Sequence, residues 1–159
     1  MKIRYLLAGL AMVAGSLHAQ GLSVEAPWVR ATVPGQQATG AFMKITAPQG
    51  ARLIGVSTPV APVAEIHEMR MDGDVMRMRA IDRLELPAGK TVELRPGSFH
   101  IMLMNLKVAL KPDSTIPLTF TLVDAQGVQR QEQVQVPVRL TPPAQMPAGM
   151  PDHSMHMKN

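Results

Sequence analysis

Cysteine is absent from the 159-residue sequence. Its absence excludes disulfide-stabilised folds, thiolate zinc sites, iron–sulfur clusters, cysteine nucleophiles and the cysteine-ligated blue-copper centre. Aromatic residues are scarce, with one Trp, one Tyr and three Phe, so binding of nucleic acid by base stacking is not expected. Aliphatic and aromatic residues still make up 46% of the chain and charged residues 18%, which is typical of one globular domain.

The first 19 residues have the layout of a secretory signal peptide. Lys2 and Arg4 precede a short apolar run, and small and polar residues follow it up to Ala19. The run is too short to cross a membrane as a helix, although an N-terminal membrane anchor is the alternative. Cleavage after Ala19 removes two positive charges and lowers the net charge from +4 to +2. We therefore expect a periplasmic protein without stable membrane insertion after cleavage and without a nucleic-acid partner.

Residues 20–140 read as short β-runs separated by Gly and Pro turns, and no window of twelve or more residues shows a helical period. This pattern predicts an all-β domain, either a β-sandwich or a small Greek-key barrel. Residues 141–159 contain four prolines and no apolar periodicity, which predicts a flexible tail. The expected strands are 23–30, 40–46, 51–57, 63–69, 75–81, 91–94, 99–106, 117–124 and 129–138.

Asp72-Gly73 is the strongest turn signal in the chain, and it favours a two-residue type I′ hairpin. With these two residues as the loop, His67 faces Met78, Met69 faces Met76, and Glu68 faces Arg77. Strand alternation places His67, Met69, Met76 and Met78 on one face of the hairpin. The predicted hairpin thus brings an imidazole next to thioethers.

A second group of the same residue types lies at 99–104. On a strand, Phe99, Ile101 and Leu103 share the core face, while His100, Met102 and Met104 share the other. Imidazoles and thioethers form a soft, neutral ligand set that suits Cu(I) and Ag(I) and has little affinity for hard ions. The alternative is that the methionines fill space, with Met69, Met71, Met76 and Met104 forming a hydrophobic rim.

The spacing of four of these residues resembles the H-x₁₀-M-x₂₁-H-x-M signature of the periplasmic PCuAC copper chaperones. The matching positions are His67, Met78, His100 and Met102, and the resemblance extends over residues 22–140. It implies that these four residues bind the metal and that the fold is a cupredoxin-like Greek-key β-sandwich. It also implies delivery of Cu(I) to the copper centres of cytochrome c oxidase, notably the binuclear site of subunit II. The partner that the resemblance implies is that subunit or another copper-receiving protein, such as a thiol-based copper-assembly factor.

Other function classes fit the sequence less well. An electron-transfer cupredoxin would need a cysteine ligand, and a copper oxygenase would typically need histidine as the first mature residue, where Gln20 is expected. No catalytic triad, paired-acid site or phosphate-binding glycine loop stands out, so we do not expect an enzyme. General periplasmic copper buffering or tolerance, without a dedicated client, remains the alternative to delivery.

The tail supplies a second candidate site. It contains His153, Met155, His156 and Met157, and imidazole accepts Cu(II) as well as Cu(I). We therefore expect a second, weaker copper site there, which could take Cu(II), or else a tail without a metal role.

Overall fold

The computed structural model describes residues 21–143, which form ten β-strands and no helix. Within that range no helix is long and apolar enough to cross a membrane. The predicted signal peptide and residues 144–159 of the predicted tail lie outside the described residues. The strands are β1 (Ser23–Arg30), β2 (Ala38–Thr46), β3 (Ala51–Ser57), β4 (Val63–Asp72), β5 (Val75–Ile81), β6 (Leu84–Leu86), β7 (Thr91–Leu94), β8 (His100–Met104), β9 (Thr115–Asp124) and β10 (Gln129–Arg139).

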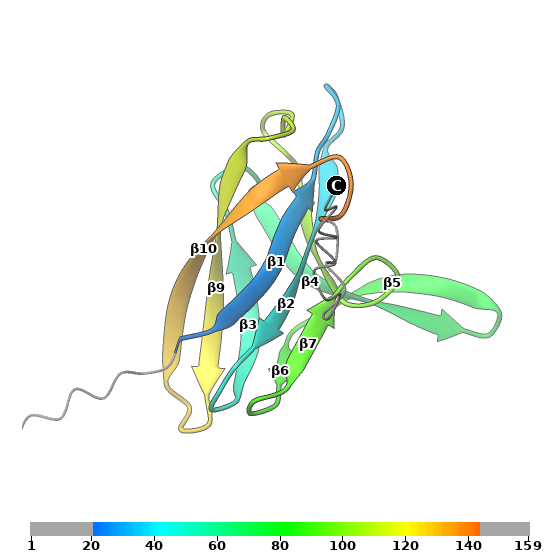
Figure 1. Ribbon diagram of the computed structural model, residues 1–159. Coiled ribbons are helices and arrows are strands. Elements are labelled where there is room, and N and C mark those ends of the chain that lie inside the picture. Colours follow the sequence, from blue (N-terminus) through cyan, green and yellow to red (C-terminus); the bar gives the residue numbers. More distant parts are fainter. Residues whose placement is uncertain (1–20, 144–159) are drawn as a thin grey trace, which may run out of the picture.

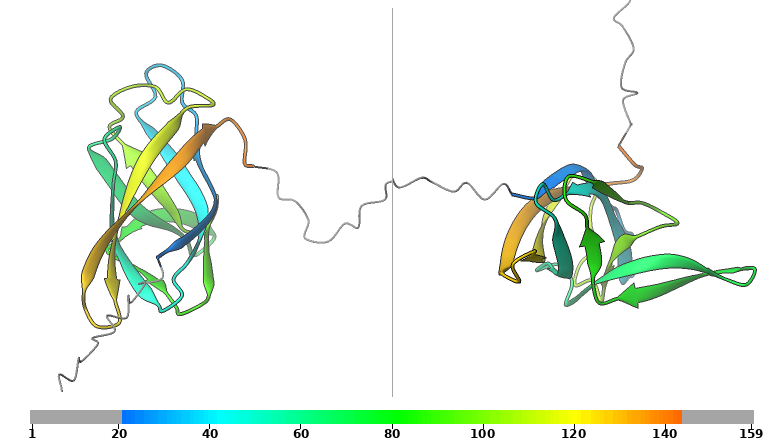
Figure 2. Two further views of the ribbon diagram at one scale, coloured as in Figure 1. Left: turned by 60° about the vertical axis from the view of Figure 1, so that its left-hand side comes forward. Right: turned by 90° about the horizontal axis from the view of Figure 1, so that it is seen from below.

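The strands are hydrogen-bonded in the order β5-β4-β8-β2-β1-β10-β9-β3-β6, with β7 also paired to β2. The β1–β10 pair is parallel, and the other pairs are antiparallel. The sheet curls so that β3 comes into contact with β4 and the curled sheet encloses a common core (Figures 1 and 2). The prediction of an all-β domain is confirmed.

Alternation of apolar and polar residues explains the core. In β9 every second side chain from Ile116 to Leu122 is buried, as a strand with one inward face requires. Leu118, Phe120 and Leu122 from β9 meet Ile101 and Leu103 from β8, and all five are fully buried in one cluster. The β8 side chains that alternate with Ile101 and Leu103 therefore lie on the opposite face of the sheet, away from this core.

Strands β4 and β5 continue past the body of the sheet as a hairpin that projects from it (Figure 1). We call residues 68–80 the arm. Every residue from Arg70 to Ala80 is exposed, because β5 is the edge strand and the outer half of β4 has no other neighbour.

The predicted register of the arm was wrong by two residues. The loop is Gly73-Asp74 rather than Asp72-Gly73, so that Asp72 faces Val75. Gly73 has φ of 63° and Asp74 is not among the residues with positive φ, which fits a type II′ turn, where only the first central residue needs a positive φ. A type I′ turn would have required both.

The shift changes every facing pair but moves no side chain to the other face, because strands alternate with a period of two. Met78 faces Met69 rather than His67, and His67 faces Ala80. Glu68 pairs with Arg79 rather than Arg77, and Arg77 pairs with Asp72 at 2.8 Å. These charged pairs are on the opposite face of the arm from the methionines.

Most predicted strands lie within two or three residues of the observed ones. Strand β6 was missed because its three residues, Leu84–Leu86, are too few to show alternation.

Candidate metal centre

Three neighbouring strands position the four predicted ligands. His67 lies on β4, Met78 on β5, and His100 and Met102 on β8, and β4 lies between the other two. His67 faces His100 directly, and Ile66 faces the core residue Ile101 on the other side of the sheet. All four ligand candidates therefore project from the face opposite the core.

Met78 reaches across β4 to contact His100. Two strand spacings separate β5 from β8, roughly 9.5 Å, and the two side chains span this distance so that Met78 Sδ lies 3.1 Å from His100 Nε2. His67 occupies the intervening strand, with its ring centroid 5.7 Å from that of His100. The prediction that Met78 lies next to an imidazole is confirmed, but the histidine that it contacts is His100 and not His67.

The orientation of the His100 ring is fixed by the backbone. Its Nδ1–H donates to the carbonyl oxygen of Ser98 at 3.1 Å. In the neutral ring this leaves the Nε2 lone pair directed at Met78 Sδ. Two atoms with lone pairs, a nitrogen and a sulfur, thus lie side by side, and His100 is only 6% exposed. This is the arrangement that a soft cation can bind.

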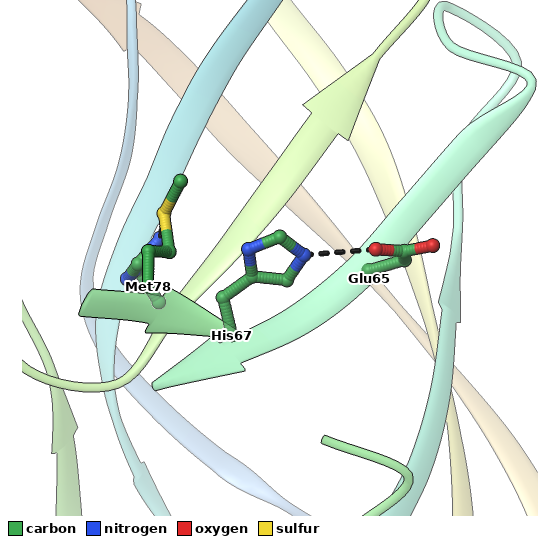
Figure 3. Close-up of polar contacts among 4 residues, drawn as sticks. Glu65, His67 and Met78 are labelled. Carbon is green, nitrogen blue, oxygen red and sulfur yellow. Dashed lines mark hydrogen bonds and ion pairs between the residues drawn. The ribbon is translucent and has the colours of Figure 1, made fainter. Parts of the chain in front are cut away.

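His67 is fixed in the complementary way. Its Nε2–H donates to Glu65 Oε2 at 2.8 Å, and its buried Nδ1 makes no hydrogen bond with any part of the chain that the structure describes. In the view of Figure 3, Glu65 and Met78 lie on opposite sides of the His67 ring. A carboxylate that holds one nitrogen of a histidine and leaves the other bare is a common supporting partner of metal-binding histidines.

Sequence reasoning missed Glu65, although strand geometry could have found it. Residues two apart on a strand share a face, so a glutamate two positions before a candidate ligand is within reach of it.

A cavity of about 320 Å³ opens beside His100. Three of the four predicted ligands line it, and so does Met69, which faces Met78 across the arm. His67 is not among its lining residues. The lining consists of Arg30, Gln36, Thr39, Gly40, Phe42, Met69, Met78, Pro96, Gly97, His100 and Met102.

An aromatic pair shields the site on the β2 side. Phe42 packs on Trp28 with ring centroids 4.8 Å apart, and it lies 6.3 Å from the His100 ring. Gly40 faces Met102, and a Cβ at Gly40 would lie 2.7 Å from the Phe42 ring. The glycine therefore lets the Phe42 ring lie flat against β2, close to the two ligand candidates on β8.

Oxygen ligands are few around this site. In residues 21–143 no group of three or more His, Asp or Glu side chains is placed to hold a metal ion, and such groups are what harder cations need. The second candidate site, at His153, Met155, His156 and Met157, lies outside the described residues.

Comparisons with known proteins agree with this fold. Solved structures that resemble the chain include the solution structure of CuI-DR1885 from Deinococcus radiodurans, with 30% identity, a TM-score of 0.57 and coverage of 79% of this chain and 85% of that one. The copper-bound PCuAC domain from PmoF2 has 21% identity, a TM-score of 0.56 and coverage of 76% and 93%, and it supports the fold alone.

The family is shown by sequence. A protein of Leifsonia xyli subsp. xyli, named "Putative lipoprotein Lxx21020", is 32% identical over 123 residues, which are 77% of this chain and 72% of that protein. The model of the family described as "Putative lipoprotein LpqE-like" matches residues 22–138. The chain belongs to this LpqE-like family, and its fold is that of the PCuAC domains.

Proposed function

We propose that this protein is a copper chaperone that binds Cu(I) through His67, Met78, His100 and Met102. The observation that carries the proposal is the 3.1 Å contact between His100 Nε2 and Met78 Sδ, with His100 Nδ1 held by the carbonyl of Ser98. The thioether sulfur is a soft ligand that favours Cu(I) over Zn²⁺, Mg²⁺ or Ca²⁺, and a neutral imidazole nitrogen binds Cu(I) as well.

The exposure of the site suits a carrier. His67 and His100 are 8% and 6% exposed, whereas Met78 is 48% exposed on the projecting arm. A receiving protein can therefore approach the ion from the Met78 side and replace that ligand first, while the histidines still hold the ion. We infer transfer of the ion without chemical turnover.

We propose that the ion is delivered in the periplasm to the copper centres of cytochrome c oxidase, with subunit II or an intermediate copper-receiving protein as partner. A similar structure, CuI-DR1885, is copper-loaded. The relatives named as lipoproteins support a location in the cell envelope.

Competition against a Cu(I) chelator tests the binding site. His100→Ala should weaken Cu(I) binding at least tenfold without unfolding the domain, because it removes the better-buried ligand of the contact pair. Met104→Leu is the matched control, since Met104 lies two residues beyond Met102 on the same strand and faces Ala38 and Val63 rather than a ligand candidate. Equal affinity of the His100→Ala variant and the parent protein would overturn the assignment.

Delivery and buffering are separated by a transfer experiment. The rate of copper transfer to an apo fragment of oxidase subunit II should be higher from the loaded protein than from a Cu(I)–chelator complex. Both donors are compared at the same concentration of free Cu(I). A rate no faster than that of the chelator would favour general copper buffering.

We further propose a second copper site at His153, Met155, His156 and Met157. Truncation after Leu140 should leave one tightly bound Cu(I) per domain and remove most Cu(II) binding, because it removes the imidazoles of His153 and His156 and imidazole accepts Cu(II). Identical Cu(II) stoichiometry in the truncated and full-length proteins would exclude this second site.

A further inference from the structure

The arm carries more thioethers than the proposed Cu(I) site uses. Met69 faces Met78, and two residues further out Met71 faces Met76. All four side chains are on the same face of the hairpin, because facing residues and residues two apart share a face. All four positions are methionine, although packing alone would also accept Leu, Ile or Val.

Burial does not explain the outer pair. Met71 is 56% exposed and Met76 is 49% exposed, and neither belongs to the hydrophobic core cluster of the described residues. The opposite face of the arm has the composition expected of a solvated hairpin, with ion pairs between Glu68 and Arg79 and between Asp72 and Arg77. Val75, 54% exposed, is the large apolar side chain on the charged face, whereas Met71, Met76 and Met78 are all exposed on the other. This grouping of exposed apolar side chains indicates that the methionine face has a binding role.

The geometry of the outer pair suits one soft ion. Directly opposed side chains have Cβ atoms roughly 4.5–5.5 Å apart, and each methionine has three rotatable side-chain bonds, so both sulfurs can reach a common cation. Asp74, in the loop next to Val75, adds negative charge at the tip of the arm. Met69 and Met78 lie roughly 6.6 Å further along the strands, between the outer pair and His100.

We propose that Met71 and Met76 form an outer site for a soft monovalent cation, Cu(I) or Ag(I), from which the ion passes by way of Met69 and Met78 to the inner site. This inference rests on the proposed function, since it assigns the entry route to the same centre. The outer site binds more weakly than the inner one, because it lacks imidazole ligands and must order two mobile side chains. Movement of the ion is an exchange of thioether ligands and involves no change of oxidation state.

Methionine methyl NMR of the full-length protein, titrated with Ag(I), tests the outer site residue by residue. Each methionine gives its own signal, assigned by single Met→Leu substitutions. Met78 and Met102 should shift with the first equivalents, and Met71 and Met76 should shift together at higher Ag(I). Met71→Leu keeps the apolar area but removes one sulfur. It should weaken the Ag(I) affinity measured from the Met76 signal at least tenfold.

Two other methionines serve as controls. Met43 is 3% exposed in the core and its signal should stay fixed, which reports an intact fold. Met104 is partly exposed and has no facing methionine, so its signal should respond far more weakly than those of Met71 and Met76.

The possible failures can be told apart. A response of Met78 and Met102 without any response of Met71 and Met76 at saturation would overturn the outer site and leave the proposed function standing. An unaltered Met76 response in the Met71→Leu protein, or a Met104 response as strong as theirs, would show single-thioether association and also overturn it. If none of the four signals shifted, from Met71, Met76, Met78 and Met102, the result would contradict the outer site and the proposed function together.

Discussion

His67 Nε2 donates to Glu65 Oε2 at 2.8 Å while His67 Nδ1 lies buried without a hydrogen-bond partner in the described chain. His100 shows the same division with its nitrogens exchanged, since Nδ1 donates to Ser98 and Nε2 lies against Met78. Each imidazole therefore has one nitrogen committed to orientation and one bare.

Glu65 should act as a positioning residue for His67. Glu65→Ala removes the acceptor that holds the ring, and loss of such a partner typically weakens metal affinity about 10-fold to 100-fold. Glu65→Gln keeps an oxygen acceptor and should recover most of the affinity. Chelator competition on both variants checks this, and equal losses in the two would show that hydrogen-bond orientation is not the role of Glu65.

Met69 should contribute less than Met78. Both side chains line the cavity. Met78 contacts His100 directly, whereas Met69 faces Met78 on the neighbouring strand. We expect Met78→Leu to weaken Cu(I) binding about tenfold or more and Met69→Leu by roughly threefold, since leucine keeps the volume and removes the sulfur. A larger loss in Met69→Leu than in Met78→Leu would exchange their roles.

Acidification should weaken Cu(I) binding. A protonated imidazole has no lone pair to donate, so protons compete with the ion at His67 and His100, whereas thioethers do not titrate. Cu(I) affinity should therefore be lower at pH 5 than at pH 7.5. The same titration on a His67→Ala/His100→Ala protein should be nearly flat. A flat profile in the parent protein would argue against imidazole ligands.

Gly40→Ala should damage both the fold and the site. The added Cβ would meet the Phe42 ring at 2.7 Å, and that ring is held between Trp28 and the His100 side. Overpacking of this kind costs about 1–3 kcal/mol of unfolding free energy. Denaturant unfolding and Cu(I) competition should both change. Gly55→Ala is the control, because its Cβ would make ordinary contacts at 3.7 Å with Thr121.

The face of the arm could be predicted from sequence, and its register could not. Asp72-Gly73-Asp74 contains two candidate loop dipeptides, and the choice between them depends on which central positions take a positive φ. Because the two choices differ by two residues, both place His67 and Met78 on one face. The contact of Met78 with His100 depends on the long-range pairing of β4 with β8, which no local turn signal encodes.

X-ray absorption at the copper edge, on full-length protein loaded with one equivalent of Cu(I), tests the central claim most directly. The account predicts Cu(I) with both nitrogen and sulfur neighbours, and loss of sulfur scattering in a Met78→Leu/Met102→Leu protein with nitrogen scattering retained. A copper ion surrounded by nitrogen and oxygen alone, or sulfur scattering unchanged in the double variant, would contradict it.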